Sequence, residues 1–322
     1  QYSNMMAAAA GYIGGHIVYP NKELGPAYDD AMQKMVFDPL GMKSTTFDYA
    51  RALAGNHATP HSDDIDGKPK VASMDINYSI YPARPAGAVW TSAADLAHYV
   101  QDELNLGKLP DGKQLVSSEN LLMRRKPQVP LGEDAIYGMG LIVDRTYGVP
   151  VLSHGGSMSG FKSNWYALPE SGVGAVLLTN ADNGGMLEGP FRRRLLEVLF
   201  DGKPEAVADV ASRAATHKAA LAKDRERLVV PPDPAAVSTL AKHYSSKELG
   251  DLGVFTKDGI TTFDLGEWKS TVASRKNDDG TTSFITIDPG TDGFEFVVGE
   301  REGKKVLVIR DGQHEYTFTE GA

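Results

Sequence analysis

Apolar side chains in the first 200 residues recur at two spacings, which predict a mixture of helices and strands. Over residues 26–40 the spacing is close to 3.6, which predicts a helix lying on a core and ending at Gly41. Thr91 and Ser92 are hydroxyl residues placed to cap a second helix. Residues 190–200 form a third amphipathic pattern.

Short apolar runs separated by Gly, Pro and Asn lie between the last two predicted helices. They cover residues 138–144, 149–153, 164–168 and 174–179. Such runs are typical of an antiparallel sheet, and we expect the helix over 190–200 to pack on it. By contrast, residues 57–84 show no periodicity and predict a long surface loop, a kind of segment that often borders a binding site.

The pattern changes after residue 202. Residues 205–228 contain no Gly or Pro and predict an exposed helix, which the prolines of 231–234 end. A short helix over 235–243 is followed by many β-type runs, which predict a small all-β barrel or sandwich. These runs are 261–263, 271–273, 282–287, 294–298 and 305–309. We therefore expect three parts, with limits 1–202, 203–234 and 235–322.

Composition and charge exclude several classes of protein. The 322 residues suffice for two domains, and the net charge of −9 argues against a protein that binds nucleic-acid backbones. The lack of cysteine excludes disulfides, thiolate metal sites, iron–sulfur clusters and a cysteine nucleophile. No apolar run reaches the roughly 20 residues that span a bilayer.

Two short polar motifs are the strongest candidates for chemistry. The first is Tyr2-Ser3-Asn4. A tyrosine has an unperturbed pKa of about 10 and serves as a base only if a cation stabilises its phenolate. The second is His154-Gly155-Gly156-Ser157, whose glycines leave a strand edge free of side chains for a substrate backbone. His154 adds a polar donor without permanent charge, which disfavours a substrate carboxylate at that point.

Further motifs between these two occur in a fixed order. They are Phe37-Asp38-Pro39-Leu40-Gly41-Met42 with Thr45, Pro85-Ala86-Gly87 with Thr91-Ser92-Ala93-Ala94-Asp95-Leu96, Tyr137-Gly138-Met139-Gly140, and Gly160-Phe161 with Ser163. Together with the two polar motifs, the series resembles the serine beta-lactamase-like hydrolases: class C beta-lactamases, family VIII esterases, D-aminopeptidases and DD-peptidases. The resemblance covers about residues 1–200.

The resemblance implies an α/β (α+β) transpeptidase-like domain over residues 1–202, with an antiparallel sheet flanked by helices and an N-terminal part missing. The β domain over 235–322 resembles the lipocalin-like barrels appended to D-aminopeptidase-type relatives. Tyr2 matches the family's catalytic base and Asn4 its substrate-orienting amide. His154-Gly155-Gly156 matches the Lys-Thr-Gly strand in its His-x-Gly variant, and the backbone N–H of Ser157 would be one oxyanion-hole donor.

One motif departs from the family's pattern. The family's nucleophile is the Ser of a Ser-x-x-Lys motif at the start of a helix upstream of Tyr-x-Asn. The match in this chain is Ser159-Gly160-Phe161-Lys162, which directly follows the His-Gly-Gly strand and contains a poor helix residue. We interpret it as a chance match. We expect the nucleophile upstream of Gln1, on a segment that this chain lacks, and expect the chain alone to be inactive.

The resemblance implies hydrolysis of an ester or of an amide or peptide, including one that contains a D-amino acid, through an acyl-enzyme. It implies no metal or organic cofactor. The expected partners are a small-molecule or peptide substrate and the missing N-terminal fragment, and the implied location is periplasmic or secreted. Two alternatives stay open: a class C-like beta-lactamase, and a non-catalytic penicillin-recognition-like or partner-binding protein with a decayed site.

Three lesser candidates have simpler interpretations. His57 and His61 with Asp63 and Asp64 have plausible metal spacing, but they lie in the predicted loop, and a solvated loop is the favoured reading. Arg192-Arg193-Arg194 suggests a patch for an anionic partner, but the solvent-exposed face of the amphipathic helix is the simpler interpretation. Three aromatic residues suggest an acyl pocket, with core packing as the default: Tyr81, Trp90 and Trp165.

Overall fold

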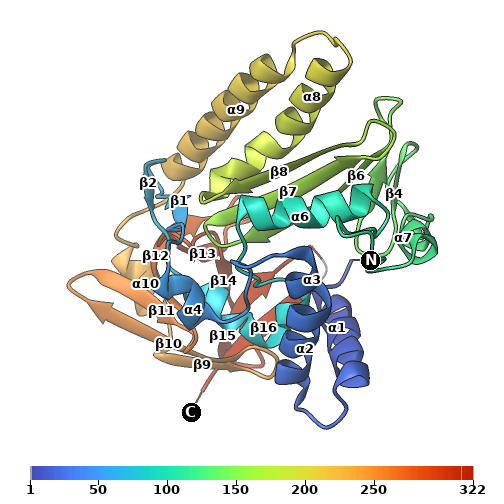
Figure 1. Cartoon of the computed structure of the whole chain (residues 1–322). Coiled ribbons are helices and arrows are strands. Elements are labelled where there is room, and N and C mark those ends of the chain that lie inside the picture. The colour runs from blue at the N-terminus through green and yellow to red at the C-terminus, as the bar shows by residue number, and fades with distance from the viewer. Residues whose placement is uncertain (1, 313, 322) are drawn as a thin grey trace. The chain divides into compact units, whose positions relative to one another are not determined.

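The computed structural model describes residues 2–312 and 314–321, so Gln1 lies outside the described residues. The chain forms two compact units, which are described separately (Figure 1). Unit 1 comprises Gln1–Ala58, Ile80–Asn180 and Leu187–Gly202; unit 2 comprises Thr59–Ser79, Ala181–Met186 and Lys203–Ala322. The domain limits expected from the sequence, 1–202, 203–234 and 235–322, stay predictions.

Unit 1 has helices before and after the strands of its sheet. They are α1 (Asn4–Val18), α2 (Leu24–Met32), α3 (Asp38–Leu40), α4 (Tyr49–Ala54), α6 (Ala93–Leu104), α7 (Ser118–Arg124) and α8 (Glu188–Leu199). A π-helical turn (Gln33–Phe37) joins α2 to α3, and Gly41 ends this run in a left-handed conformation with φ of 70°. The helix predicted over 26–40 is therefore confirmed.

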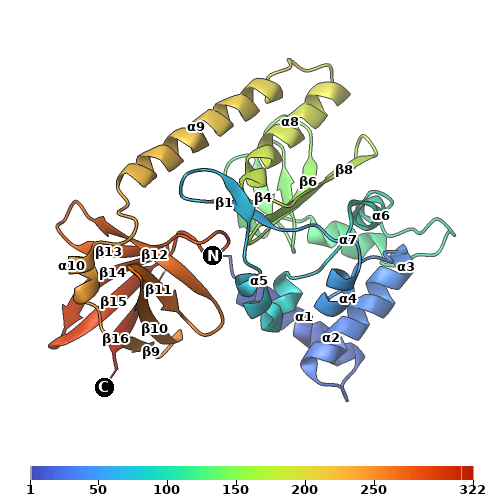
Figure 2. The same cartoon turned by 90° about the vertical axis from the view of Figure 1, so that its left-hand side faces the viewer.

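The sheet of unit 1 has six antiparallel strands in the order β3-β4-β5-β6-β7-β8 (Figure 2). They are β3 (Val129–Pro130), β4 (Ala135–Tyr137), β5 (Ile142–Asp144), β6 (Val151–Met158), β7 (Phe161–Leu168) and β8 (Val173–Thr179). Val100 of α6 packs with Leu152 and Trp165, whereas Leu196 of α8 packs with Val151. Since alternate residues of a strand point to opposite faces, the two helices cover opposite faces of the sheet. The antiparallel sheet and the packing of the helix over 190–200 are confirmed.

Residues 57–84, predicted as a long surface loop, contain several short elements of secondary structure. The segment contains the hairpin β1 (His61–Asp63) and β2 (Pro69–Val71), the helix α5 (Asp75–Ser79) and the start of a 3₁₀ helix (Tyr81–Ala86). The carboxylate of Asp64 accepts hydrogen bonds from the backbone N–H groups of Asp66 and Lys68, which closes the hairpin turn. Elements of three to six residues are too short for a hydrophobic period to reveal them.

Unit 2 contains a closed barrel of eight antiparallel strands in the order β10-β11-β12-β13-β14-β15-β16-β9. Its strands are β9 (His243–Ser246), β10 (Gly250–Lys257), β11 (Ile260–Asp264), β12 (Lys269–Lys276), β13 (Thr282–Thr286), β14 (Glu295–Arg301), β15 (Lys304–Arg310) and β16 (Glu315–Glu320). Phenylalanine rings fill its interior, among them Phe263, Phe284, Phe296 and Phe318. The structure thus selects the barrel over the sandwich.

A long and a short helix lead directly into the barrel strands of unit 2. The long exposed helix predicted over 205–228 is confirmed as α9 (Ala206–Glu226). The short helix predicted over 235–243 is α10 (Pro234–Ser238), and β9 begins at His243. No described helix of either unit has the length and apolar character that crossing a membrane requires.

Candidate active site

The structure brings Tyr2 and His154 together and adds Tyr137, which was not among the predicted site residues. The ring of Tyr2 lies 6.5 Å from that of His154 and 6.0 Å from that of Tyr137, measured between centroids. The ring centroids of Tyr137 and His154 are 5.8 Å apart. Three rings from the start of the chain, from β4 and from β6 therefore form one cluster.

The start of α1 sets the position of Tyr2. Ser3 is the N-cap residue of this helix, and its side-chain oxygen accepts a hydrogen bond of 3.3 Å from the backbone N–H of Met6. This cap satisfies one of the free donors at the helix start. Tyr2 precedes the cap with 56% of its surface exposed, and Asn4 is the exposed first residue of the helix. The Tyr-Ser-Asn motif is thus a helix start with a tyrosine in front of it.

Both ring nitrogens of His154 have hydrogen-bond partners. Nδ1 lies 2.8 Å from the carbonyl oxygen of Gly155, and Nε2 lies 3.0 Å from the hydroxyl of Tyr137. Burial, and then the neighbouring Tyr2, raise the pKa of Tyr137. The phenol of Tyr137 therefore stays protonated at neutral pH and is available as a donor.

One edge of β6 is open where the predicted site lies. Strand β5 pairs with β6 from Val151 to Ser153, whereas β7 pairs with β6 from Leu152 to Met158. Within the described residues, the part of β6 from His154 onward is thus paired on one side. Its Gly155, Gly156 and Ser157 are exposed. An extended ligand backbone can pair with such an edge.

The two glycines also meet a packing requirement that the sequence did not reveal. A Cβ atom at Gly156 would lie 2.5 Å from Oγ of Ser163. At Gly155 it would lie 3.2 Å from Nδ2 of Asn164 and 3.4 Å from Oε2 of Glu188. Larger residues would therefore displace these side chains of β7 and α8, in addition to filling the open edge.

Ser157 and Lys162 face each other across the β6–β7 hairpin. Nζ of Lys162 donates a hydrogen bond of 2.9 Å to Oγ of Ser157. The Ser-x-x-Lys match from Ser159 to Lys162 runs through the turn of this hairpin, where Gly160 has φ of 76°. Because the match does not begin a helix, its geometry differs from that of the family's nucleophile motif.

The three aromatic residues suggested for an acyl pocket do not form one group. Trp165 is 7% exposed and packs in the core beneath α6. Trp90 and Tyr81 both contact the ring of Tyr49, at centroid distances of 5.9 and 5.5 Å. Trp90 also lies 5.6 Å from Phe161 at the start of β7. Core packing therefore explains Trp165, whereas Trp90 belongs to an aromatic group beside the β6–β7 turn.

The residues with metal-like spacing have other partners. His57 Nδ1 lies 3.0 Å from the carbonyl oxygen of Gly55, and Oδ2 of Asp63 lies 3.4 Å from Nε2 of His217. Asp64 closes the β1–β2 turn, as described above. In the part of the chain that the structure describes, no group of three or more His, Asp or Glu side chains is arranged to hold a metal ion.

The three consecutive arginines of α8 are engaged within unit 1. Arg192 forms an ion pair with Asp144 of β5, and Arg193 and Arg194 both pair with Glu197. Arg192 has 23% of its side chain exposed, so it does not lie on the wet face of the helix. For Arg192, neither a patch for an anionic partner nor a solvent-exposed helix face describes its position, because this side chain joins α8 to the sheet.

The chain is similar to several known proteins. The sequence model of the Beta-lactamase family matches residues 1–199. "Penicillin-binding protein 4" of Amycolatopsis lactamdurans is 30% identical over 214 residues, which are 63% of this chain and 55% of the relative. A "D-aminopeptidase" of Cereibacter sphaeroides is 26% identical over 161 residues, which are 49% of this chain and 28% of the relative. The chain thus spans about half of the first relative and about a quarter of the second.

Two solved structures are also similar. An octameric penicillin-binding protein homologue from Pyrococcus abyssi has a TM-score of 0.49 and 16% identity, with 91% of this chain and 60% of that chain covered. A D-amino acid amidase from Ochrobactrum anthropi SV3 has a TM-score of 0.42 and 20% identity, with 68% and 58% covered. The match over residues 1–199 confirms the predicted transpeptidase-like fold, and the chain belongs to the beta-lactamase family.

Proposed function

We propose that this chain is the larger part of a serine hydrolase that cleaves an ester or amide through an acyl-enzyme. The observation that carries the proposal is the contact of Tyr2 with the rings of His154 and Tyr137, beside the open edge of β6. A phenol at this edge is placed to exchange protons with a substrate paired along it. The names of the chain's relatives, "penicillin-binding protein" and "D-aminopeptidase", favour a peptide or amide substrate.

In the proposed reaction, a serine oxygen attacks the substrate carbonyl and passes its proton to the phenolate of Tyr2. The bond to the leaving group breaks, and the leaving group takes that proton from Tyr2. Water then attacks the acyl carbon, gives one proton to Tyr2, and the serine oxygen leaves and regains it. The backbone N–H of Ser157 stabilises the negative oxygen in both steps, and the side-chain amide of Asn4 orients the substrate.

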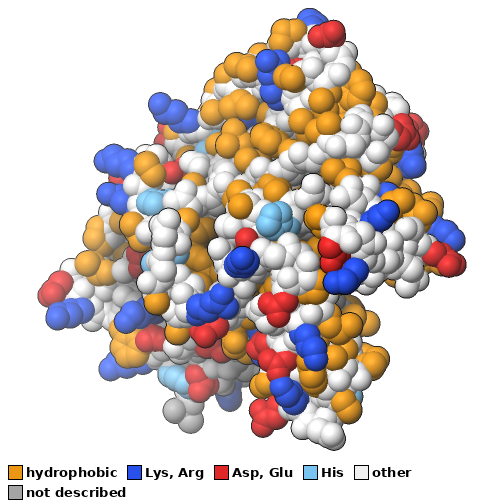
Figure 3. Space-filling model, viewed as in Figure 1, with side chains coloured by type: hydrophobic (Ala, Val, Ile, Leu, Met, Phe, Trp, Pro, Cys, Tyr) orange, Lys and Arg blue, Asp and Glu red, His pale blue; other side chains and the backbone are white. Residues whose placement is uncertain are grey.

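The proposal requires a nucleophilic serine and its lysine outside residues 1–322, since Ser159 to Lys162 forms a hairpin turn. The lysine would supply the cation that a tyrosine base needs. Apolar side chains on α1 support a segment that packs there: Met5, Met6 and Ile17 are 70%, 70% and 74% exposed. Figure 3 shows apolar side chains at the lower right, where α1 lies. Under this proposal the chain alone is inactive.

Labelling the longest natural polypeptide that contains this chain tests the proposal. A fluorophosphonate or fluorescent penicillin should label the serine of a Ser-x-x-Lys motif. Replacing Tyr2 by Phe should lower turnover by about 100-fold or more, as expected for loss of general acid–base catalysis. Tyr147→Phe is the matched control, because Tyr147 is 49% exposed on the β5–β6 turn.

Three outcomes would reject the proposal or part of it. A natural polypeptide without a Ser-x-x-Lys motif would favour a non-catalytic recognition protein. Unchanged turnover in Tyr2→Phe would remove Tyr2 from the mechanism. Rapid hydrolysis of a cephalosporin, with slow hydrolysis of peptides and esters, would favour a class C-like beta-lactamase instead.

A further inference from the structure

We infer that Tyr137 is a positioning residue that fixes the neutral ring of His154 as the Nδ1–H tautomer. The tautomer follows from hydrogen bonding alone, whereas its effect on turnover rests on the hydrolase function proposed above. Tyr137 lies on β4 and was absent from the predicted site, although it begins the Tyr-Gly-Met-Gly motif.

The argument starts at the carbonyl oxygen of Gly155. This oxygen can only accept a hydrogen bond, so the 2.8 Å contact requires a proton on Nδ1 of His154. A neutral imidazole carries one proton, which leaves Nε2 as an acceptor. The hydroxyl of Tyr137, 3.0 Å away, must then donate to Nε2. The carbonyl oxygen of Gly155 therefore sets the tautomer, and the hydroxyl of Tyr137 stabilises it by donating to the opposite side of the ring.

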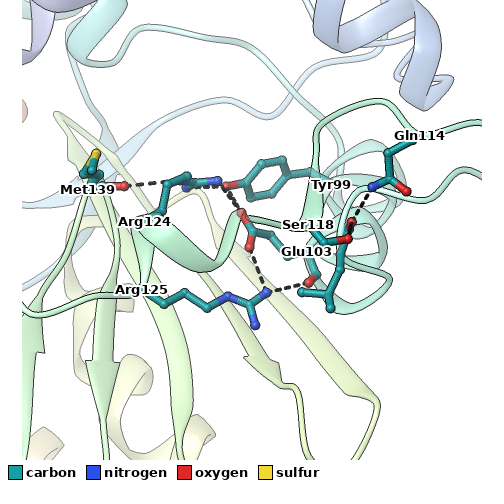
Figure 4. A network of polar contacts seen from close by, with 8 residues as sticks. Tyr99, Glu103, Gln114, Ser118, Arg124, Arg125 and Met139 are labelled. Atoms are coloured by element: carbon teal, nitrogen blue, oxygen red, sulfur yellow. Dashed lines mark hydrogen bonds and ion pairs between the residues drawn. The ribbon is translucent and has the colours of Figure 1, made fainter. Parts of the chain in front are cut away.

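Strand pairing and a buried ion pair hold Tyr137 in place. Tyr137 pairs with Ile142 of β5, and Met139, two residues further along the chain, is hydrogen-bonded to the end of α7. The N–H of Met139 donates to the carbonyl oxygen of Arg124 at 2.9 Å, and Nε of Arg124 donates to the carbonyl oxygen of Met139 at 3.3 Å. Arg124 is in turn paired with the fully buried Glu103 (Figure 4).

Gly138 permits this hydrogen-bonded contact. A Cβ atom at Gly138 would lie 2.0 Å from the carbonyl oxygen of Arg124, so the backbones could not approach with any larger residue. The network from Glu103 through Arg124 to Met139 therefore fixes the backbone next to Tyr137. Rigid support of this kind is what a positioned hydrogen bond requires.

The tautomer has a consequence for substrate choice. With Nδ1–H bound to Gly155 and Nε2 occupied by Tyr137, neutral His154 has no free proton for a substrate carboxylate. Removing the Tyr137 hydroxyl would free Nε2, and the Nε2–H tautomer would then offer a donor. We therefore expect Tyr137 to select against substrates that carry a carboxylate at this point of the site.

Nitrogen-15 NMR of the full chain at a pH where histidines are neutral tests the tautomer. The His154 signals are identified by their loss in His154→Gln. The wild-type chain should show the proton on Nδ1, and Tyr137→Phe should shift population to the Nε2–H form, whereas Tyr147→Phe should leave the signals unchanged. An Nε2–H ring in the wild-type chain, or an identical tautomer in Tyr137→Phe, overturns the inference. The wild-type result decides even if the variant fails to fold.

A kinetic measurement tests the consequence in the longest natural polypeptide. The ratio of kcat/KM for a carboxylate-bearing substrate to that for its neutral amide should rise several-fold in Tyr137→Phe. An unchanged ratio overturns the selectivity role. If the polypeptide shows no turnover but His154 has the expected tautomer, the proposed function is rejected and the tautomer assignment is kept. If turnover is normal but the tautomer is the opposite one, the tautomer assignment is rejected and the proposed function is kept.

Discussion

Glu103 and Arg124 form an ion pair whose carboxylate has no exposed surface. Arg125 approaches the same carboxylate at 3.3 Å, and the hydroxyl of Tyr99 donates to it at 3.1 Å. Burial is the main cause that raises the pKa of Tyr99 to about 12, so this phenol remains a donor. One carboxylate of α6 thus holds the end of α7 and, through Arg124, the backbone beside Tyr137.

Replacing Glu103 by Gln should therefore destabilise unit 1 strongly. The change leaves two guanidinium groups beside a neutral amide, and breaking a buried ion pair of this kind costs about 3–5 kcal/mol. Urea unfolding followed by fluorine NMR of 5-fluorotryptophan at Trp165 measures the free energy of unfolding. Lys113→Gln, which breaks the exposed pair of Lys113 with Asp111, is the control and should leave that free energy unchanged. Equal effects of the two changes would contradict the role given to Glu103.

Adjacent glycines of α1 should respond oppositely to alanine. A Cβ atom at Gly15 would lie 2.6 Å from Cα of Tyr28, and the backbone of α2 cannot give way cheaply. Gly15→Ala should lower the free energy of unfolding by about 1–3 kcal/mol. At Gly14 a Cβ atom meets nothing within 4 Å, so Gly14→Ala should raise it by about 0.5–1 kcal/mol. The same sign for both variants in urea unfolding would show that α1 does not pack on α2 this closely.

The sequence predicted those elements of the fold that are long or strongly patterned. The helices α6, α8 and α9 and the antiparallel sheet of unit 1 were found from their periods and caps. The hairpin β1–β2 and strands β3, β4, β9, β10 and β16 were missed. Strand β10 contains Gly250 and Gly253, which weaken its strand signal, whereas β16 alternates apolar and polar residues over six positions and could have been predicted.

The site was predicted in part, because motifs identify residues but not their contacts. The sequence indicated that Tyr2 and His154 belong together, although 151 residues separate them. It could not show that Tyr137 occupies Nε2 of His154, since this contact depends on the register of β4 against β5. Nor could it show that Gly156 lies close to the side-chain hydroxyl of Ser163 across the hairpin.

The ion pair between Asp144 and Arg192 should make the stability of unit 1 depend on pH. Burial alone would raise the pKa of Asp144, but hydrogen bonds from Thr146 and Arg192 outweigh it and hold the pKa below its usual range. A carboxyl whose pKa is lower in the folded state stabilises the protein above its unfolded pKa of about 3.9 and loses this effect as the pH falls through its folded pKa.

Asp144→Asn should accordingly lower the free energy of unfolding by about 1.5–3 kcal/mol at pH 7, the usual contribution of hydrogen bonds to a charged group. The difference from the wild-type chain should shrink as the pH falls below about 3.9. Urea unfolding at several pH values measures it. Asp134→Asn, at an exposed position of unit 1, corrects for the change in net charge. A difference that is constant from pH 7 to acid would exclude the ionised pair as its source.

Phe296 and Phe255 provide a matched test of the barrel core. Phe296 is fully buried, and its ring lies 5.2 Å from Phe263 and 6.1 Å from Phe318, whereas Phe255 is 60% exposed on β10. Removing a buried phenylalanine ring leaves a cavity as well as losing apolar contact.

Phe296→Ala should therefore lower the free energy of unfolding of unit 2 by about 3–5 kcal/mol. Phe255→Ala should change it by about 0.5 kcal/mol or less, as is usual for surface substitutions. The fluorine signal of 5-fluorotryptophan at Trp268, whose ring lies 4.9 Å from Phe294, reports unfolding of this unit in urea. If the two variants unfold at the same urea concentration, the buried ring of Phe296 contributes no more to stability than the exposed ring of Phe255. The aromatic interior would then not stabilise the barrel.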